Sequence, residues 1–144
     1  MKIALGADHA GRALKDHLGH RLQAQGHAVV DLGTHSSDST DYPDYAAAVG
    51  RAVATGEAER GLLVCGTGVG MAMAANKIAG VRAANCNNLF TARLARGHND
   101  ANVLTLGARE VGAEHAEAIL ETFLATPFDG GRHSRRIEKI ASLD

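Results

Sequence analysis

The feature that most constrains this chain is a regular alternation of short apolar runs with longer amphipathic segments. The short runs are rich in Val, Ile, Leu and Ala, as in strands buried on both faces of a sheet. The segments between them repeat their apolar residues at helical spacing. The predicted strands are Lys2–Ala7, His27–Leu32, Gly61–Cys65, Val81–Cys86 and Ala101–Leu106. The predicted helices are Gly11–Gln25, Tyr42–Gly56, Val69–Ala79, Leu89–Arg96, Ala113–Ala125 and a basic segment, Gly131–Ser142.

Five strand–helix units in succession predict an α/β fold. Right-handed crossovers place helices on both faces of a five-stranded parallel sheet, which gives a Rossmann-like three-layer sandwich. No linker or low-complexity segment divides the sequence, so we expect residues 1–144 to form a single domain. Ligands bind beyond the carboxyl ends of the strands in such sheets. Polar residues gather there, at positions 8–9, 31–34, 65–70, 85–88 and 107–109.

The composition argues against several classes of partner. The formal net charge is −1 at pH 7, which gives no support for binding to nucleic acid or to an anionic membrane. No apolar run reaches the roughly 18 residues of a membrane span, and the first residues already read as a strand. We therefore expect a cytoplasmic protein, in which Cys65 and Cys86 stay reduced.

A glycine-rich loop after the third predicted strand carries the strongest chemical signal. It reads Cys-Gly-Thr-Gly-Val-Gly from Cys65 to Gly70. Glycines let backbone N–H groups approach a ligand, and the positive end of the following helix would stabilise a negative charge at the same place. A thiol in that position ionises readily. The alternative is a buried, inert cysteine, and the flanking glycines favour the reactive interpretation.

Three other segments are candidates for the same site, and each also has a plainer explanation. Asp8 either caps the first helix or binds a ligand, and the two roles are compatible. His9 beside it suits a phosphate or a hydroxyl group. Tyr42 lies in an ordinary turn, which by itself indicates no function. His98 lies among polar residues just before the fifth strand, an arrangement that suits acid–base chemistry.

A basic segment closes the chain, with Arg132, His133, Arg135, Arg136 and Lys139. A basic helical face is usually solvated, and that explanation holds for the segment in isolation. However, Arg132 and Arg136 are four residues apart and follow two glycines. They therefore share one helical face, where two guanidinium groups could clamp a phosphate.

Familiar cofactor motifs fail on spacing. A dinucleotide fingerprint needs a glycine where Met71 stands and an acidic residue where Cys86 falls. A phosphate-binding P-loop needs Gly-Lys-Ser/Thr, whereas Lys77 follows Asn76. The sequence has no Cys-x-x-Cys, no His-x-x-x-His and no clustered carboxylates. We therefore expect neither a metal nor an organic cofactor.

Taken in order, these motifs resemble the type B ribose-5-phosphate isomerases, the family that also holds galactose-6-phosphate and allose-6-phosphate isomerases. The matching segments are Gly6-Ala7-Asp8-His9, Thr40-Asp41-Tyr42-Pro43, residues 65–70, Ala74-Ala75-Asn76-Lys77, residues 98–104 and Gly131-Arg132-His133. The resemblance implies conversion of an aldose phosphate to a ketose phosphate through a cis-enediolate, without metal or cofactor. It favours ribose 5-phosphate, and leaves allose 6-phosphate, galactose 6-phosphate and a tetrose phosphate open.

The resemblance also implies roles for individual residues. Cys65 would move the proton between C2 and C1, Thr67 would assist at the oxygens, and His98 would open the sugar ring. The substrate would be held by Asp8, His9, Tyr42, Gly66, Gly68, Gly70, Asn99, Arg109, Arg132 and Arg136. One branch of the family uses a glutamate as base at the position of Met71, so the base here must be Cys65. The family forms homodimers or tetramers with shared active sites, which implies a second copy as partner.

Two functions of other classes compete with an isomerase. A non-catalytic phosphosugar-binding module would need His9 and the arginines, but not Cys65, Thr67 and His98 together. A thiol redox protein would need a second cysteine close to the first. Cys86 ends a different predicted strand and is a poor candidate for that partner. The sequence thus favours the isomerase.

Overall fold

The computed structural model describes residues 1–144 and is built around five strands that pair only in parallel. The strands are β1 (Lys2–Ala7), β2 (Ala28–Asp31), β3 (Arg60–Cys65), β4 (Ala83–Asn85) and β5 (Val103–Gly107). Their order across the sheet is β2-β1-β3-β5-β4. The predicted five-stranded parallel sheet is confirmed. The fourth strand is shorter than predicted, because the Arg82 N–H donates to the Asn102 side chain (2.8 Å) rather than to a neighbouring strand.

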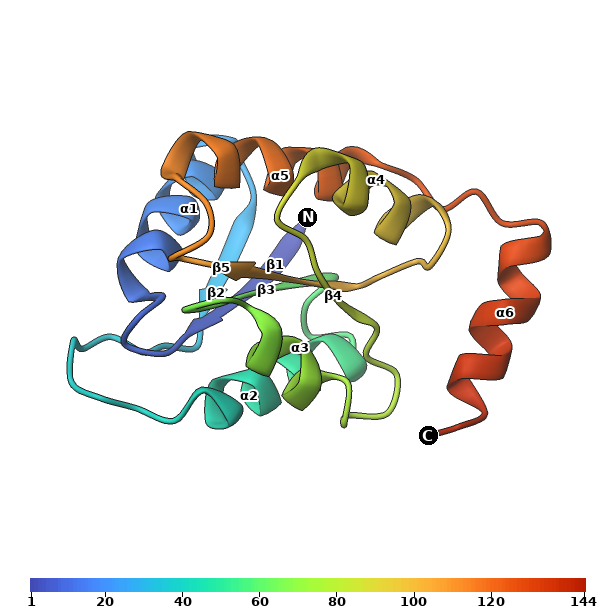
Figure 1. Ribbon diagram of the computed structural model, residues 1–144, viewed down its shortest axis with the longest axis horizontal. Helices are drawn as coiled ribbons and strands as arrows, with labels where there is room; N and C mark the ends of the chain where they lie inside the picture. Colours follow the sequence, from blue (N-terminus) through green and yellow to red (C-terminus); the bar gives the residue numbers. More distant parts are fainter.

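The helices cover both faces of this sheet, as predicted. They are α1 (Arg12–Ala24), α2 (Tyr42–Ala54), α3 (Val69–Ala75), α4 (Leu89–Gly97), α5 (Ala113–Ala125) and α6 (Arg132–Ala141). Helices α1, α4 and α5 lie on one face, and α2 and α3 lie on the other (Figure 1). Helix α3 ends earlier than predicted. Asn76 follows it and exchanges two hydrogen bonds with the backbone of Ala83 (3.0 and 2.8 Å), which fixes the chain in a turn toward β4.

Side chains alternate across the sheet and divide the core into two layers. On β3, Leu62 and Val64 face the layer under α1, α4 and α5, whereas Leu63 and Cys65 face the layer under α2 and α3. The residues of the three central strands, β1, β3 and β5, are almost all buried, as near-continuous apolar runs predict. Cys65 is therefore held at the end of a strand whose side chains are fixed by packing.

Helix α6 stands apart from the three layers (Figure 1). It follows Gly130 and Gly131, whose φ angles of 67° and 58° turn the chain away from the body. None of its residues is buried, and Ile140 and Leu143, near its carboxyl end, are exposed. A cavity of about 430 Å³ separates these two residues from the β4 edge. None of these helices combines the length and the hydrophobicity that a membrane-spanning helix requires.

Candidate active site

The carboxyl ends of β1 and β3 open into a cavity of about 420 Å³, together with the loop that follows β5. It is lined by Asp8, Tyr42, Cys65, Gly66, Thr67, Val69, Gly70, Met73 and Arg109. Most of the sequence-predicted site residues lie at or beside it. We term the following set the carboxyl-edge cluster: Asp8, His9, Tyr42, Cys65, Gly66, Thr67, Gly68, Gly70 and Arg109.

The Cys65 thiol is the centre of this cluster. The residue is only 6% exposed, and its sulfur accepts a hydrogen bond from the Gly68 backbone N–H at 3.2 Å. An N–H aimed at the sulfur stabilises a negative charge on it. The Thr67 hydroxyl lies on the same turn, where its oxygen accepts the Val69 N–H at 3.3 Å. The loop thus presents a thiol, a hydroxyl and backbone donors to one small space.

Two positions of the loop are occupied by glycine for a steric reason, which the sequence pattern only suggests. Gly68 has a φ of 81°, and a β-carbon there would collide with the side-chain oxygen of Asn85. A β-carbon at Gly70 would collide with the ring of Tyr42. Larger residues would therefore push the loop away from β5 or move Tyr42 out of the cavity. The glycines allow the backbone and the aromatic ring to approach each other.

The residues that follow β1 have a structural role as well as a place at the cavity. Asp8 is buried, and its Oδ1 accepts the Gly11 N–H at 3.1 Å, which secures the start of α1. The His9 Nδ1 accepts the Thr40 N–H at 3.1 Å, so the ring proton is assigned to Nε2. This bond ties the first turn to the segment that carries Tyr42. Asp8 also lines the cavity, so both interpretations of it stand together.

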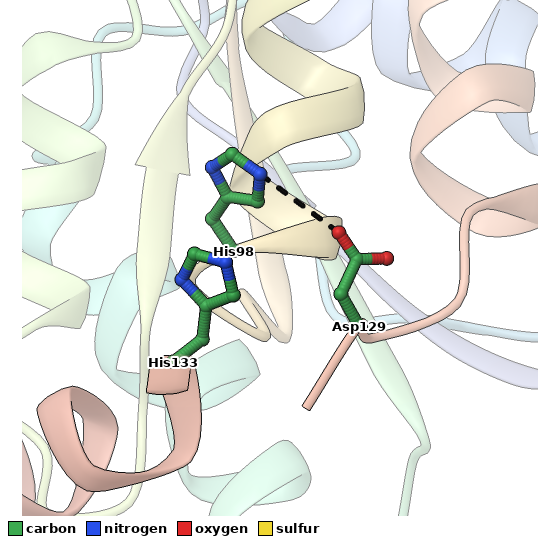
Figure 2. A group of neighbouring side chains, drawn as sticks. All are labelled: His98, Asp129 and His133. Atoms are coloured by element: carbon green, nitrogen blue, oxygen red, sulfur yellow. Dashed lines mark ion pairs between the residues drawn. The ribbon is translucent and has the colours of Figure 1, made fainter. Parts of the chain in front are cut away.

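A second cluster lies where α4 ends and the chain approaches α6. The rings of His98 and His133 are stacked, with centroids 4.3 Å apart and planes 11° from parallel. Figure 2 shows this stack and the ion pair from His98 Nε2 to Asp129 Oδ2, 3.8 Å long. The pKa of His133 is lowered by loss of water around its ring, and further by the positive groups His98, Arg132 and Arg136. We term His98, Asn99, Asp129, Arg132, His133 and Arg136 the amino-edge cluster.

The amino-edge cluster includes the residue types of a metal site. Ligand atoms of His98, Asp129 and His133 all lie within 4.8 Å of one another. However, lone pairs lie in the plane of an imidazole ring, so two nearly parallel rings do not direct them to a common point. Arg132 and Arg136 add positive charge nearby. Both features oppose a cation, and we assign no ion to these residues.

Sequence reasoning missed Asp129 and His133 as members of this cluster. No local spacing connects them with His98, because the turn at Gly130 and Gly131 brings them together in space. The sequence signal for this turn was the pair of glycines, Gly130 and Gly131. In the structure both adopt a positive φ between Asp129 and α6. A sequence pattern reports such a turn but not what the turn faces.

The two clusters lie at opposite ends of the parallel strands, one at the carboxyl edge of the sheet and one at the amino edge. At one end of the β3–β5 pair Cys65 is opposite Gly107, and at the other end Gly61 is opposite Val103. His98 and Asn99 precede Val103 and so belong to the amino ends of the strands. With a rise of about 3.3 Å per residue, the paired segment alone separates the edges by roughly 13 Å. Within one chain, His98, Asn99, Arg132 and Arg136 therefore lie away from the Cys65 cavity.

Comparisons with known proteins agree with this architecture along the whole chain. The family model described as Ribose/Galactose Isomerase matches residues 3–140. Ribose-5-phosphate isomerase B of Escherichia coli is 49% identical over 143 residues, which cover 99% of this chain and 96% of the relative. D-erythrulose-4-phosphate isomerase of Pectobacterium atrosepticum is 42% identical over 141 residues, with coverage of 97% and 93%.

Solved structures give the same result. Ribose-5-phosphate isomerase B of Clostridium thermocellum superposes with a TM-score of 0.98 at 48% identity and covers 99% of this chain and 97% of its own. Ribose-5-phosphate isomerase B of Mycoplasma genitalium, solved with bound ribulose-5-phosphate, superposes with a TM-score of 0.96 at 44% identity, with coverage of 99% and 95%. The chain belongs to the ribose/galactose isomerase family, and it is an isomerase of phosphorylated sugars.

Proposed function

We propose that this chain interconverts ribose 5-phosphate and ribulose 5-phosphate, a reaction between pentose phosphates. Support comes from the Escherichia coli relative, named for the first sugar, and from the Mycoplasma genitalium structure that holds the second. The Pectobacterium relative is named for a four-carbon substrate, so a tetrose phosphate is the competing candidate. The reacting carbons and the phosphate are common to these sugars, and only the span between them differs.

The observation that carries the mechanism is the hydrogen bond from the Gly68 N–H to the Cys65 sulfur at the cavity. As a thiolate, Cys65 takes the proton from C2 of the open-chain aldose and delivers it to C1, while the Thr67 hydroxyl assists transfer of the hydroxyl proton from O2 to O1. Negative charge then develops on the sugar oxygens of the cis-enediolate. Backbone N–H groups of residues 66–70 and the Thr67 hydroxyl are placed to stabilise that charge as it forms, which lowers the barrier to removing a carbon-bound proton.

The remaining steps need groups that the carboxyl-edge cluster lacks. Ring opening requires an acid–base group, which we assign to His98. Arg132 and Arg136 would bind the phosphate together with His9 and Arg109. His98, Arg132 and Arg136 lie at the edge of the sheet opposite Cys65. We therefore propose that a second copy of the chain supplies these three residues, with Asn99, to each Cys65 cavity.

Exposed apolar residues support this pairing of two copies. Met73 is 69% exposed at the cavity, and Val69 beside it is also exposed. Helix α6 leaves Ile140 and Leu143 uncovered. Large exposed apolar groups of this kind are typical of a surface that a partner covers. In a symmetric pair, each chain would give its carboxyl-edge cluster to one site and its amino-edge cluster to the other.

We also propose that residues 1–144 act as one catalytic domain, because the two clusters share one sheet. We place the enzyme in the cytoplasm, where a free thiol base stays reduced. Both Cys65 and Cys86 are unpaired in the structure. No cofactor is needed for the proposed steps, since every proton movement has a side chain assigned to it.

A panel of phosphorylated tetroses, pentoses and hexoses tests the substrate. Purified protein should interconvert ribose 5-phosphate and ribulose 5-phosphate with a kcat/KM at least about tenfold above that for any other sugar. Higher turnover of erythrulose 4-phosphate would contradict the pentose assignment and keep the chemistry.

Exhaustive chelation should leave turnover unchanged. Loss on chelation with rescue by a divalent ion would contradict the metal-free mechanism.

Mixing two inactive variants tests the shared site. A Cys65→Ala chain paired with a His98→Asn chain would form one doubly damaged site and one site of wild-type composition. With random pairing, about half of the dimers are mixed, so about a quarter of all sites should be intact. The two variants are unfolded and refolded together, and turnover per chain is compared with refolded wild type. A mixture as inactive as its components would show that each site belongs to a single chain.

A further inference from the structure

Arg96, in the last turn of α4, is unusual because its charged side chain is buried. The residue has a relative exposure of 4%, and it lies two positions before His98. A guanidinium group is rarely buried unless several acceptors surround it. Its acceptors belong to two segments that the amino-edge cluster needs.

The first segment is the turn that carries His98 and Asn99. Arg96 Nη1 donates to Asp100 Oδ1 at 2.8 Å and to the Ala101 carbonyl at 2.6 Å. Asp100 has a φ of 46°, a left-handed conformation that costs an aspartate roughly 1 kcal/mol and that these bonds compensate. Arg96 thus holds this turn through Asp100 and Ala101, the two residues that immediately follow Asn99.

The second segment leads from α5 to α6. Arg96 Nε donates to the Thr126 carbonyl at 3.3 Å. Three residues further on, the Asp129 N–H donates to the Gly97 carbonyl at 2.9 Å. A β-carbon at Gly97 would lie 3.2 Å from the Asp129 carboxylate, which shows how closely the two segments approach. Arg96 therefore bridges the His98 turn and the segment that ends in the basic residues of α6.

The surrounding charges show why Asp100 belongs to the same network. Its carboxylate also accepts from Arg82 Nη2 at 3.2 Å, and its carbonyl accepts from Arg82 Nε at 2.9 Å. Burial, and then the charge of Arg96, lower the pKa of nearby Arg60. Asp100 is thus the carboxylate shared by several crowded guanidinium groups.

The geometry points to Arg96 as the positioning residue of the amino-edge cluster, which it serves by fixing the His98–Asn99 turn and the approach to α6 relative to each other. Arg96 does not touch the substrate in this role. The inference rests on the proposed function, because it concerns the ring-opening and phosphate-binding half of that site. A misplacement of about 1 Å in such a half-site costs roughly 100-fold in rate.

The first test is the Arg96→Lys variant, which keeps the charge but cannot reach acceptors on both segments. Its kcat/KM for the ring-closed aldose should fall about 100-fold. Exchange of the C1 hydrogen of ribulose 5-phosphate with solvent needs no ring opening. Measured at saturating ribulose 5-phosphate, which compensates for weaker phosphate binding, this exchange should fall less than about tenfold. The exposed Arg21 of α1 provides the matched control, so Arg21→Lys should change neither quantity. Equal losses in both assays for Arg96→Lys would mean a general structural role and overturn the inference.

The second test maps the lesion by pairing chains. Arg96→Lys refolded with Cys65→Ala should restore about a quarter of wild-type sites, because each chain then supplies the cluster that the other lacks. Refolded with His98→Asn, it should restore none, since both lesions fall in the same cluster. If His98→Asn rescues Cys65→Ala but Arg96→Lys does not, the inference is wrong. If neither rescues it, the shared site is wrong, and the exchange assay alone decides the role of Arg96.

Folding is checked by circular dichroism and size-exclusion chromatography before either test. If Arg96→Lys does not fold, Asp100→Asn replaces it, because the amide keeps the shape of the carboxylate and weakens its bond to Arg96. The same pattern of rescue is expected for this variant. Failure of both variants to fold would assign the network to overall stability and overturn the inference.

Discussion

The carboxyl-edge cluster and the amino-edge cluster are formed by different kinds of structural element. The carboxyl-edge cluster consists of strand ends and a glycine loop, and its central residue, Cys65, is buried. The amino-edge cluster consists of polar side chains on the turn after α4, on the segment before α6 and on α6 itself, and the side chain of Asp129 is 59% exposed. The difference matches the demands of the proposed steps. Charge that develops on a reacting atom needs fixed backbone donors, whereas a phosphate can be held by flexible cationic side chains.

Removal of the thiol should have the largest effect and would break the comparison if it did not. We expect Cys65→Ala to lower kcat by about 10⁴-fold, the upper end for a general base. Binding of ribose 5-phosphate, measured by calorimetry, should stay within about tenfold, because the arginines provide the affinity. Cys86→Ala is the matched control and should keep near-wild-type turnover. Turnover above a few per cent in the Cys65 variant would remove the thiol from the mechanism.

The next largest effect should come from the other cluster and depend on the direction of reaction. We expect His98→Asn to lower turnover of the ring-closed aldose by about 100-fold. Ribulose 5-phosphate cannot close a ring through its phosphorylated carbon, so its C1 hydrogen exchange should fall less than about tenfold. Nuclear magnetic resonance in deuterated solvent measures this exchange. Equal losses in the two assays would assign His98 to a step other than ring opening.

Alkylation compares the two thiols directly. Burial raises the pKa of Cys86 to about 11, so hardly any thiolate is present at this residue near neutral pH. Iodoacetamide at pH 7.5 should therefore label Cys65 at least about 100-fold faster, with protection by substrate. Labelling of Cys86 should rise as the pH increases from 9 toward 11. Mass spectrometry of the two peptides gives both rates, and equal rates at pH 7.5 would contradict an activated thiol at Cys65.

The smallest expected effect concerns the glycines of the two regions. Gly68→Ala places a β-carbon against Asn85 and 2.9 Å from the Leu106 carbonyl carbon, whereas Gly130→Ala meets nothing within 4 Å. Both have positive φ, which costs about 1 kcal/mol in either case. The collision should add about 2 kcal/mol for Gly68 alone. Urea unfolding measures the difference in the free energy of unfolding, and similar values for both variants would mean that the loop is as tolerant as the turn before α6.

The same contrast explains what the sequence could predict. Apolar runs and helical spacing are local, so they predicted five parallel strands, two helical layers and a polar rim that includes Cys65. The end of α3 was misplaced because it depends on the hydrogen bonds between the Asn76 side chain and the backbone of Ala83, which a periodic pattern does not report. Asp129 was missed because only the turn at Gly130 and Gly131 brings its segment and α6 to His98. The position of His98 just before the fifth strand already places it at the amino ends of the strands. Spacing along the chain does not show which distant segments, such as the one that carries Asp129, approach it in the folded protein.

The separation of the two clusters has a consequence for how activity follows protein abundance. Under the proposed pairing, an isolated chain has a thiol without an acid for ring opening, and arginines without a thiol. Activity per chain would then decline on dilution as copies part, even though every chain stays folded. At very low expression, turnover in the cell would rise with the square of the amount of protein, and only above the dissociation constant of the pair would it become proportional.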